Sequence, residues 1–112
     1  MRPESAAFLW DVHAAATRIA EFISGIDGTS YAADDMRRSA VERQLEIVGE
    51  ALKNLRNTDP DVAQQIPDLA RIIGLRNILA HGYTVVDDAV VWSAASQRVP
   101  ELLAVVDQLL AD

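Results

Sequence analysis

The sequence predicts an all-α protein, an up-and-down four-helix bundle with short additional helices. Apolar residues recur at steps of three and four along most of the 112 residues, which is the spacing of one helix face. Gly, Pro and Asp interrupt these runs at places where helices commonly begin or end. No segment alternates convincingly between apolar and polar residues, because two Asp residues break the best candidate strand, "YTVVDDAVVW".

Two long helices account for the N-terminal half. Residues 4–24 carry apolar side chains at helical spacing, and "GIDGTS" ends this helix. Asp34 or Asp35 caps the second helix. Its apolar residues form a narrow seam suited to packing along another helix, of the same or of a second chain: Val41, Leu45, Val48, Leu52 and Leu55.

The residue pattern of the C-terminal half predicts shorter helices. Asp59 at the cap and Pro60 at the first helical position begin a short helix that "QQIPD" interrupts. A helical pattern then covers residues 69–82, where Gly82 is a natural stop. A further helix begins at "VVW", and Pro100 begins the last one.

Composition indicates one domain over residues 1–112 and a soluble protein. Half of the residues are apolar, which is enough for a single core without disulfides. There is no Cys, which is compatible with a reducing cytoplasm. Charged residues interrupt the N-terminal apolar run, so we expect neither a signal peptide nor a membrane span.

The charge balance argues against nonspecific electrostatic binding to nucleic acid over a broad surface. The formal net charge is −7, whereas phosphate binding by counterion release needs clustered cations. All basic residues except Lys53 are Arg, and the forked guanidinium suits phosphate oxygens. A local basic patch is therefore still compatible with the sequence, although the Arg excess is equally consistent with codon composition.

The stretch "RNILAHGY" gathers reactive side chains at a helix end. Arg76, His81 and Tyr83 fall within it, in a chain with only two His and two Tyr. In a regular helix Arg76 and His81 would diverge by about 140°, but a helix that ends at Gly82 relaxes this constraint.

Arg and His together suit metal-free RNA cleavage. A base takes the proton of the ribose 2′-hydroxyl, a cation stabilises the pentacovalent phosphorus, and an acid protonates the departing 5′-oxygen. One chain supplies one such His, because His13 lies far away in sequence. A two-fold dimer would bring two copies of Arg76 and His81 to one cleft. The alternative is that both residues only stabilise the dipole at the helix C-terminus.

These residues resemble the HepT-like toxins of the HEPN superfamily, small helical ribonucleases marked by Arg, four to six residues, then His, with a Tyr two places on. Arg76, Asn77, His81 and Tyr83 match this pattern without a gap. The resemblance also covers "ERQLEIVGEALKNL" and "VVWSAASQRVPELLAVV", and spans most of residues 8–110.

The resemblance implies a HEPN-like fold and a metal-independent endoribonuclease that acts as a homodimer on RNA, tRNA being one candidate. It makes Arg76 and His81 the catalytic residues. It also implies a toxin whose antitoxin partner is an MntA-type nucleotidyltransferase, which uses ATP to transfer AMP onto Tyr83 and so silences the nuclease. Otherwise Tyr83 stacks on a base or caps the helix end.

Two further residues are expected to support the site. Asn77 orients His81, bonds the ribose, or simply faces solvent. Glu50, which interrupts a mostly apolar helix, pairs with Arg76 or is an exposed carboxylate. The scattered acidic residues lack the spacing of a carboxylate metal site, so no metal or other cofactor is expected.

A non-catalytic helical partner of a nucleotidyltransferase is the competing interpretation. The complete set of Arg, His and Tyr favours the nuclease, because relatives that serve only as binding subunits often lack it. A plain dimeric scaffold would leave the set unexplained.

Overall fold

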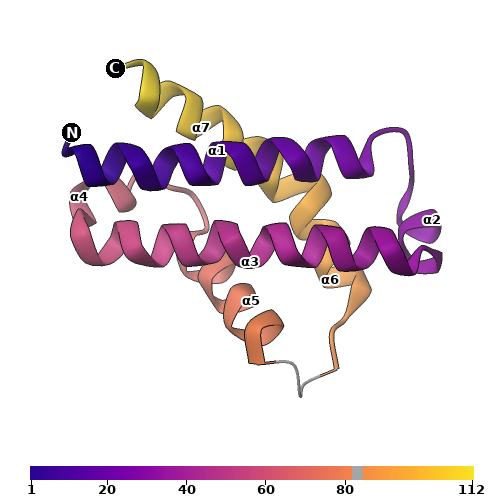
Figure 1. Ribbon diagram of the computed structural model, residues 1–112. Coiled ribbons are helices and arrows are strands. Elements are labelled where there is room, and N and C mark those ends of the chain that lie inside the picture. Colours follow the sequence, from indigo (N-terminus) through magenta and orange to yellow (C-terminus); the bar gives the residue numbers. More distant parts are fainter. Residues whose placement is uncertain (82–84) are drawn as a thin grey trace.

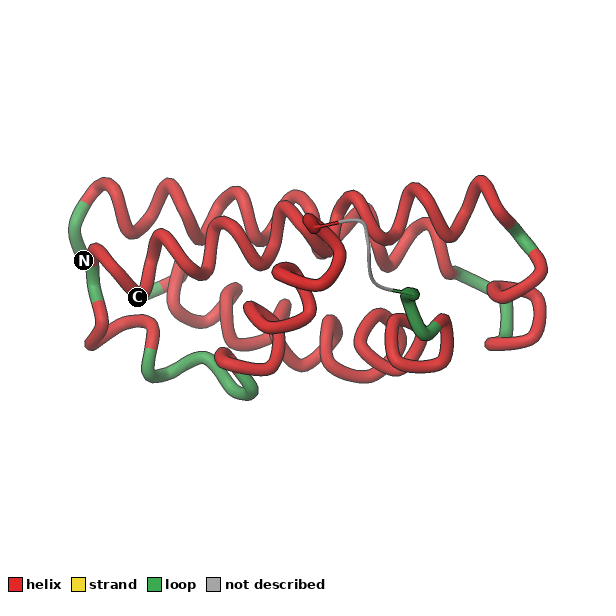
Figure 2. Tube along the Cα trace, turned by 90° about the horizontal axis from the view of Figure 1, so that it is seen from below, coloured by secondary structure: helices red, strands yellow, loops and turns green. Residues whose placement is uncertain are grey.

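The computed structural model describes residues 1–81 and 85–112, and every regular element in these two ranges is helical (Figure 2). The principal helices are α1 (Pro3–Ile23), α3 (Asp35–Thr58), α5 (Leu69–His81) and α7 (Val99–Ala111). Short elements join them: α2 (Gly28–Ala33), α4 (Pro60–Ala63), α6 (Asp88–Ser93) and the π-helical segment η1 (Ala94–Arg98). The predicted all-α bundle with short additional helices is confirmed.

Helices α1 and α3 form the centre of the bundle. They run side by side in opposite directions (Figure 1), and α5 packs on α3 while α7 packs on α1. The predicted seam of α3, from Val41 to Leu55, is buried, so within this chain it packs against another helix. Fully burying one Leu or Val side chain contributes about 1.5–3 kcal/mol, which makes this seam a main source of stability.

Side-chain caps explain where α3 and α4 begin. The Asp34 carboxylate accepts a hydrogen bond from the Arg37 amide at 3.0 Å, and α3 starts at the next residue, as predicted. Asp59 caps α4 in the same way through the Val62 amide. The buried Ser5 hydroxyl also donates to Asp59 at 2.8 Å and so ties α1 to the junction of α3 and α4.

Two details differ from the sequence-based expectation. The segment "GIDGTS" does not only end α1: Asp27 caps the short helix α2 by accepting a bond from the Ser30 amide at 2.8 Å. Pro100 does not open a separate helix, because α6, η1 and α7 follow one another without a break and α7 begins at Val99. Among the described residues, no helix combines the length and the apolar content needed to cross a bilayer.

Candidate functional site

The predicted site residues lie on α5 and on the part of α3 beneath it. Arg76 and Asn77 are in the third turn of α5, and His81 is its last residue and exposed. Because α5 is helical as far as His81, the five-residue step from Arg76 corresponds to about 7.5 Å along the helix axis and about 140° around it. The relaxation expected from the helix end therefore does not reach His81, and within one subunit the two side chains leave the helix in different directions. Gly82, the expected stop, and Tyr83 lie outside the described residues.

Arg76 is held against α3. Its guanidinium forms an ion pair with Glu50 of α3, and its Nη1 donates a hydrogen bond to the Asn77 side-chain oxygen at 2.9 Å. The Arg76 side chain is 23% exposed and that of Glu50 is 47% exposed, so water still reaches the pair. Of the two interpretations of Glu50, the structure supports the pairing with Arg76.

Gly49 allows Arg76 to lie this close to α3. A Cβ atom at Gly49 would overlap the Cβ of Arg76 and would lie 2.7 Å from its Cγ. Any larger residue would therefore push α5 away from α3 or displace the base of the Arg76 side chain. No sequence pattern singles out Gly49, because its importance depends on Arg76, which is 27 positions away in the chain and becomes a neighbour only on folding.

Arg76 lines a cavity of about 260 Å³ over α3, between α1 and α5. Phe8 and Asp11 contribute from α1, and Ala80 from α5. The rest of the lining comes from α3: Arg43, Glu46, Ile47, Glu50, Ala51 and Asn54. The Arg76 side chain is therefore placed where a bound molecule can reach it.

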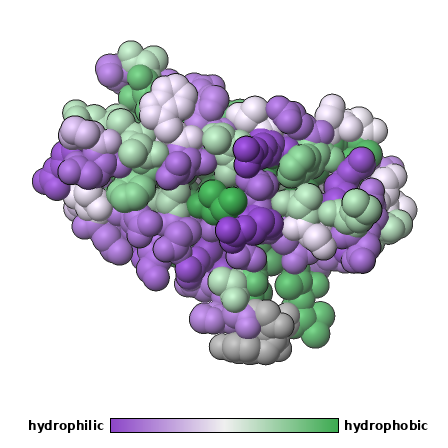
Figure 3. All heavy atoms as spheres, in the orientation of Figure 1, coloured by the Kyte–Doolittle hydropathy of each residue, from purple (hydrophilic) through white to green (hydrophobic). Residues whose placement is uncertain are grey.

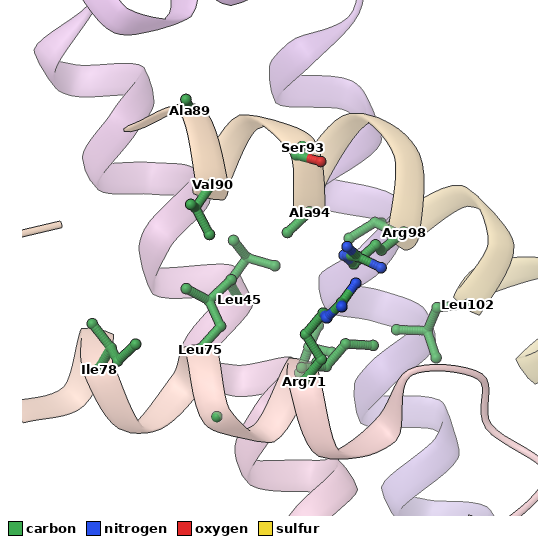
Figure 4. A pocket seen from close by; sticks show the side chains of 14 residues that line it. Leu45, Arg71, Leu75, Ile78, Ala89, Val90, Ser93, Ala94, Arg98 and Leu102 are labelled. Atoms are coloured by element: carbon green, nitrogen blue, oxygen red, sulfur yellow. The ribbon is translucent and has the colours of Figure 1, made fainter. Parts of the chain in front are cut away.

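A second and larger cavity, of about 620 Å³, lies on another face of α5 (Figure 4). It separates α5 from α6, η1 and α7, and its walls are mostly apolar, including Leu75 and Ile78 of α5 and Val90 of α6. We call it the apolar groove. Arg71 and Arg98 extend into one end of the apolar groove.

The other histidine lies elsewhere. His13 of α1 forms a 2.9 Å pair with Asp107 of α7 and contacts the ring of Trp10. It thus joins α1 to α7 and is not a lining residue of either cavity beside α5. Among the described residues, no group of three or more His, Asp or Glu is placed to hold a metal ion.

Comparison with known proteins identifies relatives over most of the chain. A family described as "Ribonuclease HepT-like" matches residues 12–109. "Putative RNase MJ1380" of Methanocaldococcus jannaschii is 36% identical over 98 residues, which cover 86% of this chain and 87% of that protein. "Probable ribonuclease HepT" of Thermococcus cleftensis is 35% identical over 97 residues, covering 85% and 86% of the two chains. No solved structure gave a significant match.

The close approach at Gly49 leads to a stability prediction. Gly49→Ala should lower the free energy of unfolding by about 1–3 kcal/mol, because the overlap with Arg76 outweighs the better helix propensity of Ala. Gly74→Ala is the matched control on α5, since a Cβ there would meet nothing within 4 Å; it should leave stability unchanged or raise it by up to about 1 kcal/mol. Equal effects of both variants in denaturant unfolding would contradict this packing.

Proposed function

Since the chain belongs to the HepT-like ribonuclease family, we propose that it is a metal-independent endoribonuclease in which Arg76 and His81 act on the scissile phosphate of RNA. The observation that carries this proposal is the placement of Arg76. Its guanidinium is fixed by Glu50 and Asn77 at the edge of a cavity, on the same helix end as the exposed His81.

The two side chains supply the parts that the reaction needs. Cleavage begins when a base removes the proton of a ribose 2′-hydroxyl and the 2′-oxygen attacks the adjacent phosphorus. The 5′-oxygen then leaves with a proton from an acid, and a 2′,3′-cyclic phosphate remains. Arg76 stabilises the extra negative charge on phosphorus, and the imidazole of His81 is the group that accepts or donates a proton.

A homodimer would complete this site. Base and acid are two roles, and one subunit contributes one histidine from α5. The apolar groove offers a surface for a second copy, because Ile78 and Val90, which line it, are 45% and 53% exposed. Hydrophobic side chains gather at this lower end of the molecule (Figure 3), and an exposed apolar surface of this kind favours association.

Regulation by a nucleotidyltransferase is the second part of this proposal, and it is supported by the position of Tyr83 in the sequence. We infer that the protein is the toxin of a toxin-antitoxin pair in the cytoplasm, and that an MntA-type antitoxin transfers AMP from ATP to Tyr83. Tyr83 is two residues beyond His81 in sequence. An adenylyl phosphate there would bring negative charge and bulk close to the residues that must receive the RNA phosphate.

The first prediction from this proposal concerns catalysis. In buffer containing EDTA, the wild type should cleave RNA, and Arg76→Ala and His81→Ala should each lower the rate by about 10²- to 10⁴-fold. Arg56→Ala and His13→Gln are matched controls, since Arg56 is an exposed arginine of α3 and His13 lies between α1 and α7. If both site variants cleave as fast as the controls, Arg76 and His81 are not the catalytic residues. If the wild type cleaves no RNA, the non-catalytic partner becomes the better interpretation.

The second prediction concerns the dimer. Light scattering at micromolar concentration should give twice the mass of one chain. Val90→Glu should shift this mass to that of a monomer and lower RNA cleavage with it, because a buried unpaired carboxylate opposes association. Met36→Glu changes an apolar residue that is 85% exposed on α3, outside the groove, and should remain dimeric. A wild-type protein that is monomeric yet active would refute the shared site.

The third prediction concerns modification. Incubation with the nucleotidyltransferase and ATP should add the mass of AMP to the wild-type protein and abolish RNA cleavage. Tyr83→Phe should gain no such mass, whereas Tyr31→Phe should be modified like the wild type, because Tyr31 is buried in the core. Labelling of Tyr83→Phe at the wild-type level would place the modification on another residue.

A further inference from the structure

The 260 Å³ cavity beside Arg76 has the wrong charge for a phosphate. Two guanidiniums, of Arg43 and Arg76, face three carboxylates, of Asp11, Glu46 and Glu50. Because its lining carries one more negative than positive charge, the cavity repels a bound anion such as phosphate. It favours a neutral group that carries hydrogen-bond donors. A phosphate held by Arg76 must therefore remain at the edge of the cavity rather than inside it.

The floor of the cavity suits a flat ring. Phe8 and Ile47 are half-buried and Ala51 is buried, so their apolar atoms form the inner wall. Unpaired RNA bases commonly stack on aromatic and apolar side chains, while their edges are read by polar groups. The volume of about 260 Å³ admits one base with its sugar at the mouth.

Glu46 stands at the polar side of this cavity in a defined position. Arg43 donates to its Oε2 at 3.3 Å, and the Glu46 side chain is only 28% exposed. An ionised carboxylate only accepts hydrogen bonds. It therefore prefers a base edge with two neighbouring donors, which guanine provides through N1–H and its 2-amino group. Uracil instead flanks its single N3–H with two carbonyl oxygens, which the carboxylate repels.

We propose that this cavity is a base-recognition subsite of the nuclease, in which Glu46 selects guanine next to the phosphate held by Arg76. The subsite rests on the proposed function for its role in cleavage, but its binding preference can be measured separately. Glu46 acts as a specificity residue: it reads the base and takes no part in moving protons at the phosphate.

Binding of mononucleotides tests the subsite without any cleavage. Guanosine 3′- and 5′-monophosphates and the two uridine counterparts would be titrated into the full-length protein by calorimetry or NMR. At least one guanosine phosphate should bind about 10- to 100-fold more tightly than its uridine counterpart, the range of discrimination that a two-bond contact to one base provides. Glu46→Gln should lose this ratio, because an amide offers both a donor and an acceptor.

Cleavage mapping on an RNA of mixed sequence gives the second readout. The wild type should cut beside guanine, and Glu46→Gln should cut with a broader choice of base. Glu42→Gln, one turn away on α3 and outside the cavity, should keep both preferences. Equal binding of guanosine and uridine phosphates, or an unchanged preference in Glu46→Gln, would overturn the subsite.

The two proposals fail in different ways. If the wild type prefers guanosine phosphates but cuts no RNA, the nuclease function fails and the subsite stands. If it cuts RNA without preferring guanine in either assay, the function stands and the subsite fails.

Discussion

The contact of Arg76 with α3 is the constraint on which the candidate site depends. An arginine on a free helix surface would sample many rotamers and would lose that freedom on binding a phosphate. Here Gly49 removes the obstacle beneath the side chain and Glu50 pairs with its far end. Two neighbouring residues of α3 thus fix one cation before any substrate arrives. Preorganisation of this kind reduces the entropic cost of binding and of stabilising charge in a transition state.

Helix α5 separates two cavities of opposite character. On one face, Arg76 borders a charged cavity over α3; on another, Leu75 and Ile78 line the apolar groove. The first cavity suits a polar ligand and the second suits a partner protein surface. His81 is the last residue of this helix. This arrangement also gives a physical reason for an acidic protein to act on RNA, because affinity would come from a few placed contacts rather than from a basic surface.

Much of this fold follows from local rules that the sequence displays. The apolar spacing predicted the long helices, Asp34 marked the start of α3, and Asp59 marked the start of the short helix α4. The pairing of Glu50 with Arg76 was one of two interpretations, the other being an exposed carboxylate, and the contact across α3 and α5 decided between them. Gly49 was missed because its role depends on Arg76, which is distant in sequence and close only in the folded chain. The short helix α2 and the π-helical η1 were also missed: α2 spans six residues in a segment typical of turns, and η1 has no distinctive sequence pattern.

The most direct test of the central claim is whether Arg76 and His81 contact one phosphate. Side-chain NMR signals of guanidinium and imidazole groups would be followed while a short RNA with a single 2′-deoxyribose at the cleavage position, which blocks the reaction, is added. The signals of Arg76 and His81 should shift together and saturate at the same RNA concentration, while those of Arg56 and His13 stay in place. Shifts at Arg56 and His13 with none at Arg76 and His81 would place the RNA elsewhere and contradict the account.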